Sequence, residues 1–494
     1  MMNNASRSTW ETVIGLEVHV ELHTKTKLFC ACANEFGHPP NTLVCPVCLG
    51  LPGTLPSLNQ AAVALHLRAA RALGCKIQTF SKFDRKNYFY PDIPKNFQTS
   101  QFDLPLAYQG WLELSSSRVI GITRIHLEED TGKSTHLALQ GTDIVASRLG
   151  RSDITHLDYN RAGVPLLEIV SEPDLRTAEE AYEYVDRLRE IMLWLGISDC
   201  KMEQGSLRCD ANVSVRPVGQ RELGTKAEIK NMNSLRSIKD AIDSEVARQI
   251  SVLEGGGRII QETRGWDEAR GTTISMRSKE EAQDYRYFPE PDLPTLAFTA
   301  EDVKAVDDAL PELPEARRER YTKVFTVDAE YLGYLTETPF FGEFFEKSVG
   351  SGGQPNEVAK WIANTIPRLV NESGQQLSQS QLSPEALGQL LNAVDQGEIG
   401  AKAAQKVLEV LFVEAAEVDQ VIDRLGLRQV SGADQLRPIL ESVLAENPTV
   451  VDEVRQGKGK ALNVLLGKVM KATQGAANAG EARRMLEELI LETV

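Results

Sequence analysis

Carboxylates and a histidine stand at positions from which they could bind a divalent cation. Residues 12–22 alternate apolar and polar side chains, which predicts a strand. Glu17 and His19 share its polar face, and side chains two positions apart on a strand lie about 6–7 Å from each other. A carboxylate and an imidazole at that spacing can share one metal ion. The alternative is a polar edge of an antiparallel sheet that contacts only water.

Two further predicted strands carry acids. Residues 119–130 form a long strand pattern that ends in three consecutive acids, and Glu168 lies in a third acidic segment. Carboxylate oxygens are the ligands that hard cations such as Mg²⁺ prefer, although a solvated turn would also explain them. Alternation alone does not decide whether Glu128 or Glu129 faces His19.

Four cysteines with the spacing C-x-C-x12-C-x2-C predict a metal site. They are Cys30, Cys32, Cys45 and Cys48. Four thiolates suit tetrahedral zinc, and a site closed by four protein ligands is structural because no position remains for substrate. The alternative is a chance cluster of reduced cysteines. The chain has 7 cysteines, an odd number that argues against a disulfide framework.

A predicted pair of strands presents alternating charged and amide side chains. The first spans residues 207–214 and the second residues 226–231. Such a face could bind the phosphates of a nucleotide together with its metal ion. A ladder of cross-strand ion pairs is the alternative. The side chains concerned are Arg208, Asp210, Asn212, Lys226, Glu228 and Lys230.

Lys86 and Lys95 lie in a segment, residues 83–101, that mixes aromatic side chains with prolines and amides. Aromatic residues of a core-facing strand would explain the rings. The two lysines are harder to explain by packing alone.

Periodicity predicts the elements that must hold these residues. Helices are expected over residues 59–73, 177–195 and 234–254, each with a capping residue or a terminal glycine. A proline-rich segment that ends at Pro294 predicts a domain boundary, and the chain becomes helical from about residue 300. The 494 residues are too many for one core, so two to four domains are expected.

The C-terminal helical part is acidic except for one basic segment within residues 455–480. This segment could contact a phosphate backbone, or it could be an ordinary solvated loop. Its cations are Arg455, Lys458, Lys460, Lys468 and Lys471.

Composition narrows the class of protein. A net charge of −16 argues against non-specific nucleic-acid binding by the whole surface. No apolar run approaches the ~20 residues that span a bilayer, and no secretory signal is visible, so a cytoplasmic setting or its organellar equivalent is expected. Gly132-Lys133-Ser134 is not part of a P-loop, because Leu127 stands where that motif needs glycine.

Five segments, in order, give the chain a resemblance to a known family. They are residues 11–21, 82–92, 126–130, 205–212 and 284–292. Together they make the chain similar, along nearly its whole length, to the GatB family, the B subunits of GatCAB aspartyl/glutamyl-tRNA(Asn/Gln) amidotransferases. The segment 459–471 resembles the YqeY-like domain of that family.

The resemblance implies an α+β protein with three parts. They are a mixed-sheet cradle domain with a zinc-knuckle insertion (residues 1–294), an all-helical domain (295–408) and a small helical YqeY-like tail that binds tRNA (409–494). It also implies ATP-dependent phosphorylation of the side-chain carboxylate of Glu-tRNA(Gln) or Asp-tRNA(Asn). Ammonia released by a glutaminase A subunit then displaces the phosphate, and a small C subunit completes the heterotrimer.

The resemblance also assigns roles to residues. Glu17, His19, Glu168 and one acid of the pair Glu128/Glu129, with Glu129 preferred, match the magnesium and catalytic positions. The six residues of the predicted strand pair match the ATP-binding region, and Lys86 and Lys95 match polar positions of an ammonia tunnel. The four cysteines match the zinc-bearing members of the family, and the basic tail residues match its tRNA-binding part. The alternative is a non-catalytic tRNA-binding module of the same complex.

Overall fold

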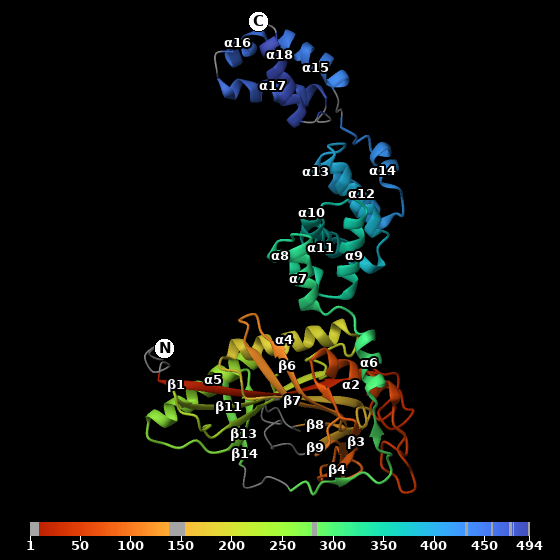
Figure 1. Cartoon of the computed structure of the whole chain (residues 1–494), viewed down its shortest axis with the longest axis vertical. Coiled ribbons are helices and arrows are strands. Elements are labelled where there is room, and N and C mark those ends of the chain that lie inside the picture. Colours follow the sequence, from red (N-terminus) through yellow and green to blue (C-terminus); the bar gives the residue numbers. More distant parts are fainter. Residues whose placement is uncertain are drawn as a thin grey trace. The chain divides into compact units, whose positions relative to one another are not determined.

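The computed structural model (Figure 1) describes residues 9–137, 154–278, 284–429, 433–455, 458–473, 477 and 479–492. The chain divides into two compact units, residues 1–313 and 314–494. Among the described residues, none of the helices is long and apolar enough to cross a membrane.

A nine-stranded mixed sheet forms the centre of the first unit. Its first strand, β1, pairs antiparallel with both β10 and β11, and β12 pairs parallel with β13. In spatial order the strands are β14 (Thr272–Ser278), β13 (Glu262–Asp267), β12 (Ala227–Lys230), β11 (Leu207–Pro217), β1 (Trp10–Glu21), β10 (Pro165–Ser171), β7 (Val119–Glu129), β6 (Ala107–Glu113) and β2 (Lys76–Ile77). The mixed sheet that the sequence predicts is confirmed.

Three small sheets accompany the large one. The first holds β15 (Phe288–Pro289), β4 (Asp84–Asn87) and β5 (Phe97–Ser100). The others pair β16 (Leu296–Ala297) with β3 (Phe80–Ser81), and β8 (Lys133–Leu137) with β9 (Ile154–Asp158).

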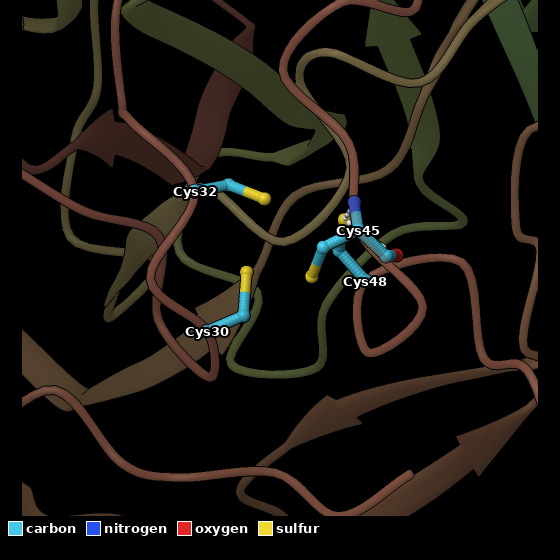
Figure 2. A group of neighbouring side chains, drawn as sticks. All are labelled: Cys30, Cys32, Cys45 and Cys48. Atoms are coloured by element: carbon cyan, nitrogen blue, oxygen red, sulfur yellow. Dashed lines mark hydrogen bonds between the residues drawn. The ribbon is translucent and has the colours of Figure 1, made fainter.

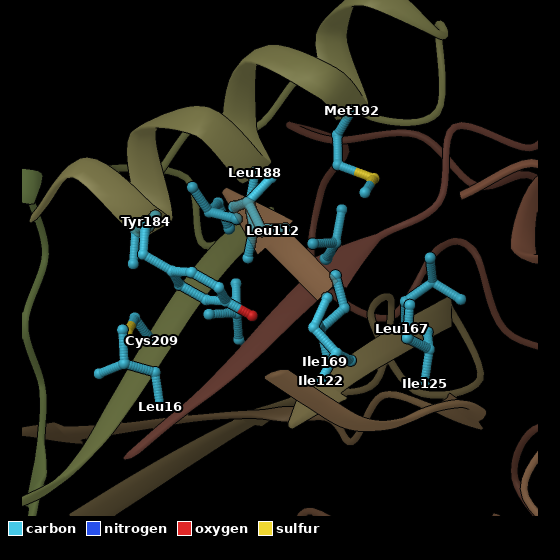
Figure 3. Packing of buried hydrophobic residues seen from close by; sticks show 14 of the residues in the cluster. Leu16, Leu112, Ile122, Ile125, Leu167, Ile169, Tyr184, Leu188, Met192 and Cys209 are labelled. Atoms are coloured by element: carbon cyan, nitrogen blue, oxygen red, sulfur yellow. The ribbon is translucent and has the colours of Figure 1, made fainter. Parts of the chain in front are cut away.

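The apolar face of the large sheet is covered by helices. Alternation places Ile14, Leu16, Val18 and Val20 of β1 on this face, and each is at most 1% exposed. Figure 3 shows the helix α4 lying over the sheet, with Tyr184 and other side chains inserted between them. The helices of this unit are α2 (Gln60–Ala72), α4 (Ala178–Trp194), α5 (Leu235–Glu254) and α6 (Ala300–Ala309).

The three helices predicted for this unit form where capping chemistry starts them. Side chains of Asn59, Thr177 and Ser234 accept backbone N–H groups of the first turns of α2, α4 and α5. Burial of one helix face and one sheet face therefore leaves the opposite face of the sheet for polar side chains.

The second unit is helical in its described part. Its helices are α7 (Pro314–Val324), α8 (Ala329–Leu335), α9 (Pro339–Gly350), α10 (Pro355–Lys360), α11 (Ile366–Ser373), α12 (Pro384–Asp395), α13 (Ala401–Val413), α14 (Val418–Arg424), α15 (Ala433–Glu446), α16 (Pro448–Arg455), α17 (Gly459–Ala472) and α18 (Ala479–Glu492). A π-helical turn at Trp361–Thr365 joins α10 to α11.

The second unit contains two separate apolar cores. One extends from Tyr321 to Ile422 and the other from Leu436 to Ile490. The predicted boundary at residue 409 falls within α13, whose Leu411 and Phe412 belong to the first of these cores. The packing thus places residues 409–422 with the middle helices rather than with the tail.

Candidate active site

One row of side chains crosses four neighbouring strands on the polar face of the sheet. The register pairs His126 of β7 with Glu168 of β10, Glu168 with His19 of β1, and His19 with Arg208 of β11. His19 Nε2 lies 3.5 Å from Glu168 Oε2, and His126 Nε2 lies 3.2 Å from the same oxygen. Side chains that are 149 positions apart in the sequence are therefore direct neighbours.

Glu128, not Glu129, is the acid that completes this cluster. Glu128 Oε1 lies 3.9 Å from His19 Nε2, and donor atoms of His19, Glu128 and Glu168 all lie within 4.8 Å of one another. Glu129 points to the other side of β7, where its carboxylate pairs with Lys95 and accepts the Thr99 N–H at 2.9 Å. The sequence-based preference for Glu129 was wrong about the face, because neighbours on a strand point in opposite directions.

Burial and neighbouring charges shift the pKa values of the groups in this cluster. The charges of His126 and His19 and their hydrogen bonds outweigh burial and lower the pKa of Glu168 well below its usual range. Burial opposes protonation of His126, but the negative charge of Glu168 and the hydrogen bond to Glu128 raise the pKa of this imidazole to about 9. A divalent cation among these carboxylates would take over the role of those imidazole protons, so the donor set fits a metal ion.

Glu17 lies next to this cluster on β1. Its Oε1 accepts a hydrogen bond from Asn212 Nδ2 at 2.9 Å, and the register places it opposite Asp210. Burial, followed by the negative charges of Glu168 and Asp210, raises the pKa of Glu17. A nearby cation stabilises the charged form of a carboxylate that is buried among other carboxylates. The sequence predicts a metal ligand at this position.

The predicted strand pair continues the polar face beyond Glu17. Lys230 of β12 forms ion pairs with Asp210 and, at 2.9 Å, with Glu228. Glu228 also accepts a hydrogen bond from Thr263 at 2.8 Å. The ion-pair ladder that was the alternative interpretation thus exists, and it lies directly beside the acid cluster. Lys226 precedes β12 and is exposed.

Arg208 connects the row of side chains to a second acidic pair. Its guanidinium contacts Asp130, and Arg161 lies 3.4 Å from the same carboxylate. Burial and the neighbouring Asp130 raise the pKa of Glu21 to about 8. Sequence reasoning did not single out His126, Asp130 or Glu21 as site residues. The two-residue spacing of His126 and Glu128, like that of His19 and Glu21, was the signal that could have identified them.

Lys86 lies beside the acid cluster, whereas Lys95 pairs with Glu129 on the other side of β7. Burial disfavours the charge of Lys86, but the carboxylates of Glu128 and Glu168 raise its pKa. Its ammonium also lies 5.0 Å from the ring centre of Tyr285. Lys95 lines a cavity of about 250 Å³ together with Glu129, Arg85 and Cys48.

The four cysteines converge from two loops. Figure 2 shows Cys30 and Cys32 facing Cys45 and Cys48, and the four sulfur atoms lie within 4.8 Å of one another. A hydrogen bond from Cys30 lowers the pKa of Cys48 to about 5, with further help from the Cys45 amide and the charge of Lys27. Four convergent sulfur ligands fit tetrahedral zinc.

The five cations of the predicted basic segment are all exposed in the second unit. Arg455 lies 3.5 Å from Asp452, and Lys458 lies 3.1 Å from Glu453. The others are Lys460, Lys468 and Lys471, all on α17.

Two domain families match the chain. Residues 12–304 match the GatB/GatE catalytic domain, and residues 343–490 match a domain described as the GatB domain. The chain belongs to the GatB family. The predicted resemblance is therefore confirmed, and the acid cluster, the ladder and the cysteine site all lie within the matched catalytic domain.

Relatives of the GatB family match over nearly their full length. A protein of Carboxydothermus hydrogenoformans, named as the B subunit of an aspartyl/glutamyl-tRNA(Asn/Gln) amidotransferase, is 48% identical over 97% of this chain and 98% of its own length. Proteins of the same name from Moorella thermoacetica and Synechocystis are 49% and 44% identical. The Synechocystis match covers 100% of both chains.

Proposed function

We propose that this chain is the kinase and transamidase subunit of a glutamine-dependent tRNA amidotransferase. It converts Glu-tRNA(Gln), Asp-tRNA(Asn) or both to the amidated forms. A carboxylate is a poor electrophile because its leaving group would be oxide, and phosphorylation with ATP supplies a better one. The observation that carries the proposal is the convergence of half-buried His19 with buried Glu128 and Glu168 within the matched catalytic domain.

The acid cluster would hold Mg²⁺. When bound, Mg²⁺ neutralises negative charge during phosphoryl transfer and aligns the reacting groups. His19, Glu128 and Glu168 offer the ligand atoms, and Glu17 lies beside them as a further carboxylate. Lys86 adds a positive charge next to this cluster, where it can attract the side-chain carboxylate of the aminoacyl group.

The neighbouring ladder would bind ATP. Arg208 and Lys230 supply positive charge for phosphates, and Asp210, Asn212 and Glu228 can orient a nucleotide and its metal ion. Lys226, exposed at the end of the ladder, would contact the outer part of the nucleotide. Because these groups already pair with one another, nucleotide binding must exchange some of these ion pairs for contacts with phosphate.

The proposal also includes an ammonia path, partner subunits, a zinc site and a tRNA-binding tail. Ammonia from a glutaminase A subunit would reach the site past Lys86 and Lys95, and a small C subunit would complete a cytoplasmic heterotrimer. The four cysteines would bind a structural zinc ion. The tail would hold tRNA through its exposed cations.

A purely tRNA-binding module is not favoured, because RNA binding does not require a cluster of acids.

The test is a heterotrimer that carries His19→Ala, assayed for ATP hydrolysis that depends on misacylated tRNA. We expect a loss of about 100-fold or more, because a ligand of the reacting centre is removed. Glutaminase activity should be measured separately, since it belongs to the partner. Retained tRNA-dependent hydrolysis would refute the role of this cluster.

A further inference from the structure

Lys27 is fully buried next to the four-cysteine site. Its side chain is 0% exposed, and its Nζ donates to Leu43 O at 2.8 Å and lies 3.3 Å from Tyr159 O. The third neighbour is Cys48 Sγ, at 3.8 Å. Among the described residues, no carboxylate lies within 4.0 Å of this ammonium.

A buried ammonium without a counter-ion is costly, and two carbonyl groups satisfy only its hydrogen bonds. The four sulfur atoms beside it supply the missing charge. Four thiolates with charge −4 and one Zn²⁺ with charge +2 give a centre with net charge −2. Burial of Lys27 is therefore explained when the thiolate centre is its ionic partner.

The three contacts of Lys27 join separate segments. Leu43 precedes the second pair of cysteines, and Tyr159 begins the loop that reaches Gly163. A Cβ placed on Gly163 would lie 3.5 Å from Cys48 Cβ, 3.6 Å from Lys27 Cδ and 3.9 Å from Glu129 Oε2.

The backbone of Gly163 extends the same connection toward the active site. Gly163 N–H donates to Asp130 O at 2.9 Å, and Leu28 N–H donates to Gly163 O at 2.8 Å. The cysteine site and the acidic end of β7 are thus packed around one glycine, with the lysine between them.

We infer that Lys27 is a positioning residue, whose ammonium partly neutralises the negative charge of the zinc–thiolate centre and holds this centre against the loop that supports Glu129 and Asp130. This inference rests on the proposed zinc site. It assigns the lysine a charge-dependent role in metal retention, separate from its hydrogen bonds to carbonyl groups.

The first test measures zinc transfer from the full-length chain to a chromogenic chelator. Lys27→Met removes both charge and donors, Lys27→Gln keeps donors without charge, and exposed Lys25→Met is the matched control. We expect both Lys27 variants to lose zinc about tenfold faster or more, the usual effect of removing a group that supports metal ligands, and the control to match wild type. Wild-type release rates in Lys27→Gln would overturn the charge-based role.

The second test compares melting temperatures with zinc bound and after zinc removal. Lys27→Gln should lower the Tm of the zinc-loaded chain more than that of the zinc-free chain, because bound zinc holds all four sulfur atoms as thiolates and gives the ionic partner of Lys27 its full negative charge. An equal decrease in both would mean that Lys27 acts through carbonyl groups alone and would overturn the inference. A wild-type chain that binds no zinc would overturn the zinc site itself, whereas bound zinc with unchanged release rates refutes only the role of Lys27.

Discussion

At the scale of single residues, the direction of a side chain decides its chemistry. Glu128 and Glu129 are adjacent in sequence, yet one lies beside His19 and the other beside Lys95. Alternation predicted Glu17 and His19 as neighbours, and the family resemblance added Glu168 to their group. Alternation did not decide between Glu128 and Glu129, and the preference for Glu129 was wrong, because the strand that carries them meets β10 in a register that only the folded sheet defines.

Exchanging each of these two acids separates their roles. In the heterotrimer, Glu128→Gln should reduce tRNA-dependent ATP hydrolysis by about 100-fold, because it removes a charged ligand atom from the cluster. Glu129→Gln should retain most of this hydrolysis, since its carboxylate faces Lys95 and Thr99. Equal losses in the two variants would contradict this assignment.

His126 makes the stability of the metal-free protein depend on pH. Its folded-state pKa of about 9 exceeds the ordinary value of about 6.5, so its stabilising effect is complete below pH ~6.5 and is lost as pH rises to about 9. The raised pKa corresponds to at most about 3 kcal/mol. Melting curves without Mg²⁺ should therefore shift down by several degrees across this range.

His126→Gln is the comparison for that slope. The variant should show a flatter decrease of Tm between pH 6.5 and 9, although Glu21, with a pKa raised to about 8, leaves a residual decrease. Identical slopes in wild type and variant would exclude His126 as the source.

At the scale of elements, alternation and capping made β1, β7, α2, α4 and α5 predictable. Register was not predictable, since the partners of β1 come from residues 165–217 and depend on contacts across the whole sheet. The two cysteine pairs could be assigned to one metal site from the sequence, because four thiolates are the typical ligands of a tetrahedral structural zinc ion. The link from Lys27 to this site had no sequence pattern that would have revealed it.

Removing zinc should loosen only the cysteine loop. Within it, the N–H groups of Asn41 and Leu43 donate to side chains of Asp158 and Asn160 at 3.0 and 2.8 Å. Hydrogen exchange at these two amides should become at least about tenfold faster after chelation, while β1 amides stay protected. Unchanged exchange in this loop would argue against a structural metal.

At the scale of the whole molecule, the chain consists of two compact units, and each unit has its own apolar cores. The family resemblance predicted three parts, and the described residues of the second unit form two cores. The sequence around the predicted boundary at residue 409 does not reveal that Leu411, Phe412 and Val421 pack with the middle helices. We therefore propose a tail that begins after residue 429.

Deleting residues 433–494 should weaken tRNA binding and leave the first unit folded. The deletion removes the five exposed cations of the basic segment, so the dependence of affinity on salt concentration should also become less steep. Filter binding at several salt concentrations measures both effects. An unchanged affinity and slope would contradict tRNA binding by the tail.

If the acid cluster supports transfer of a phosphoryl group from ATP to a side-chain carboxylate, the resulting acyl phosphate can be trapped. Hydroxylamine, supplied with ATP, Mg²⁺ and misacylated tRNA, converts an acyl phosphate to a side-chain hydroxamate that mass spectrometry detects without any glutaminase step. We expect Glu168→Gln to lower the yield of hydroxamate by about 100-fold or more, while Glu113→Gln, which changes an exposed acid of the same sheet, gives the wild-type yield. A wild-type yield of hydroxamate from Glu168→Gln would refute a role of the acid cluster in carboxylate activation.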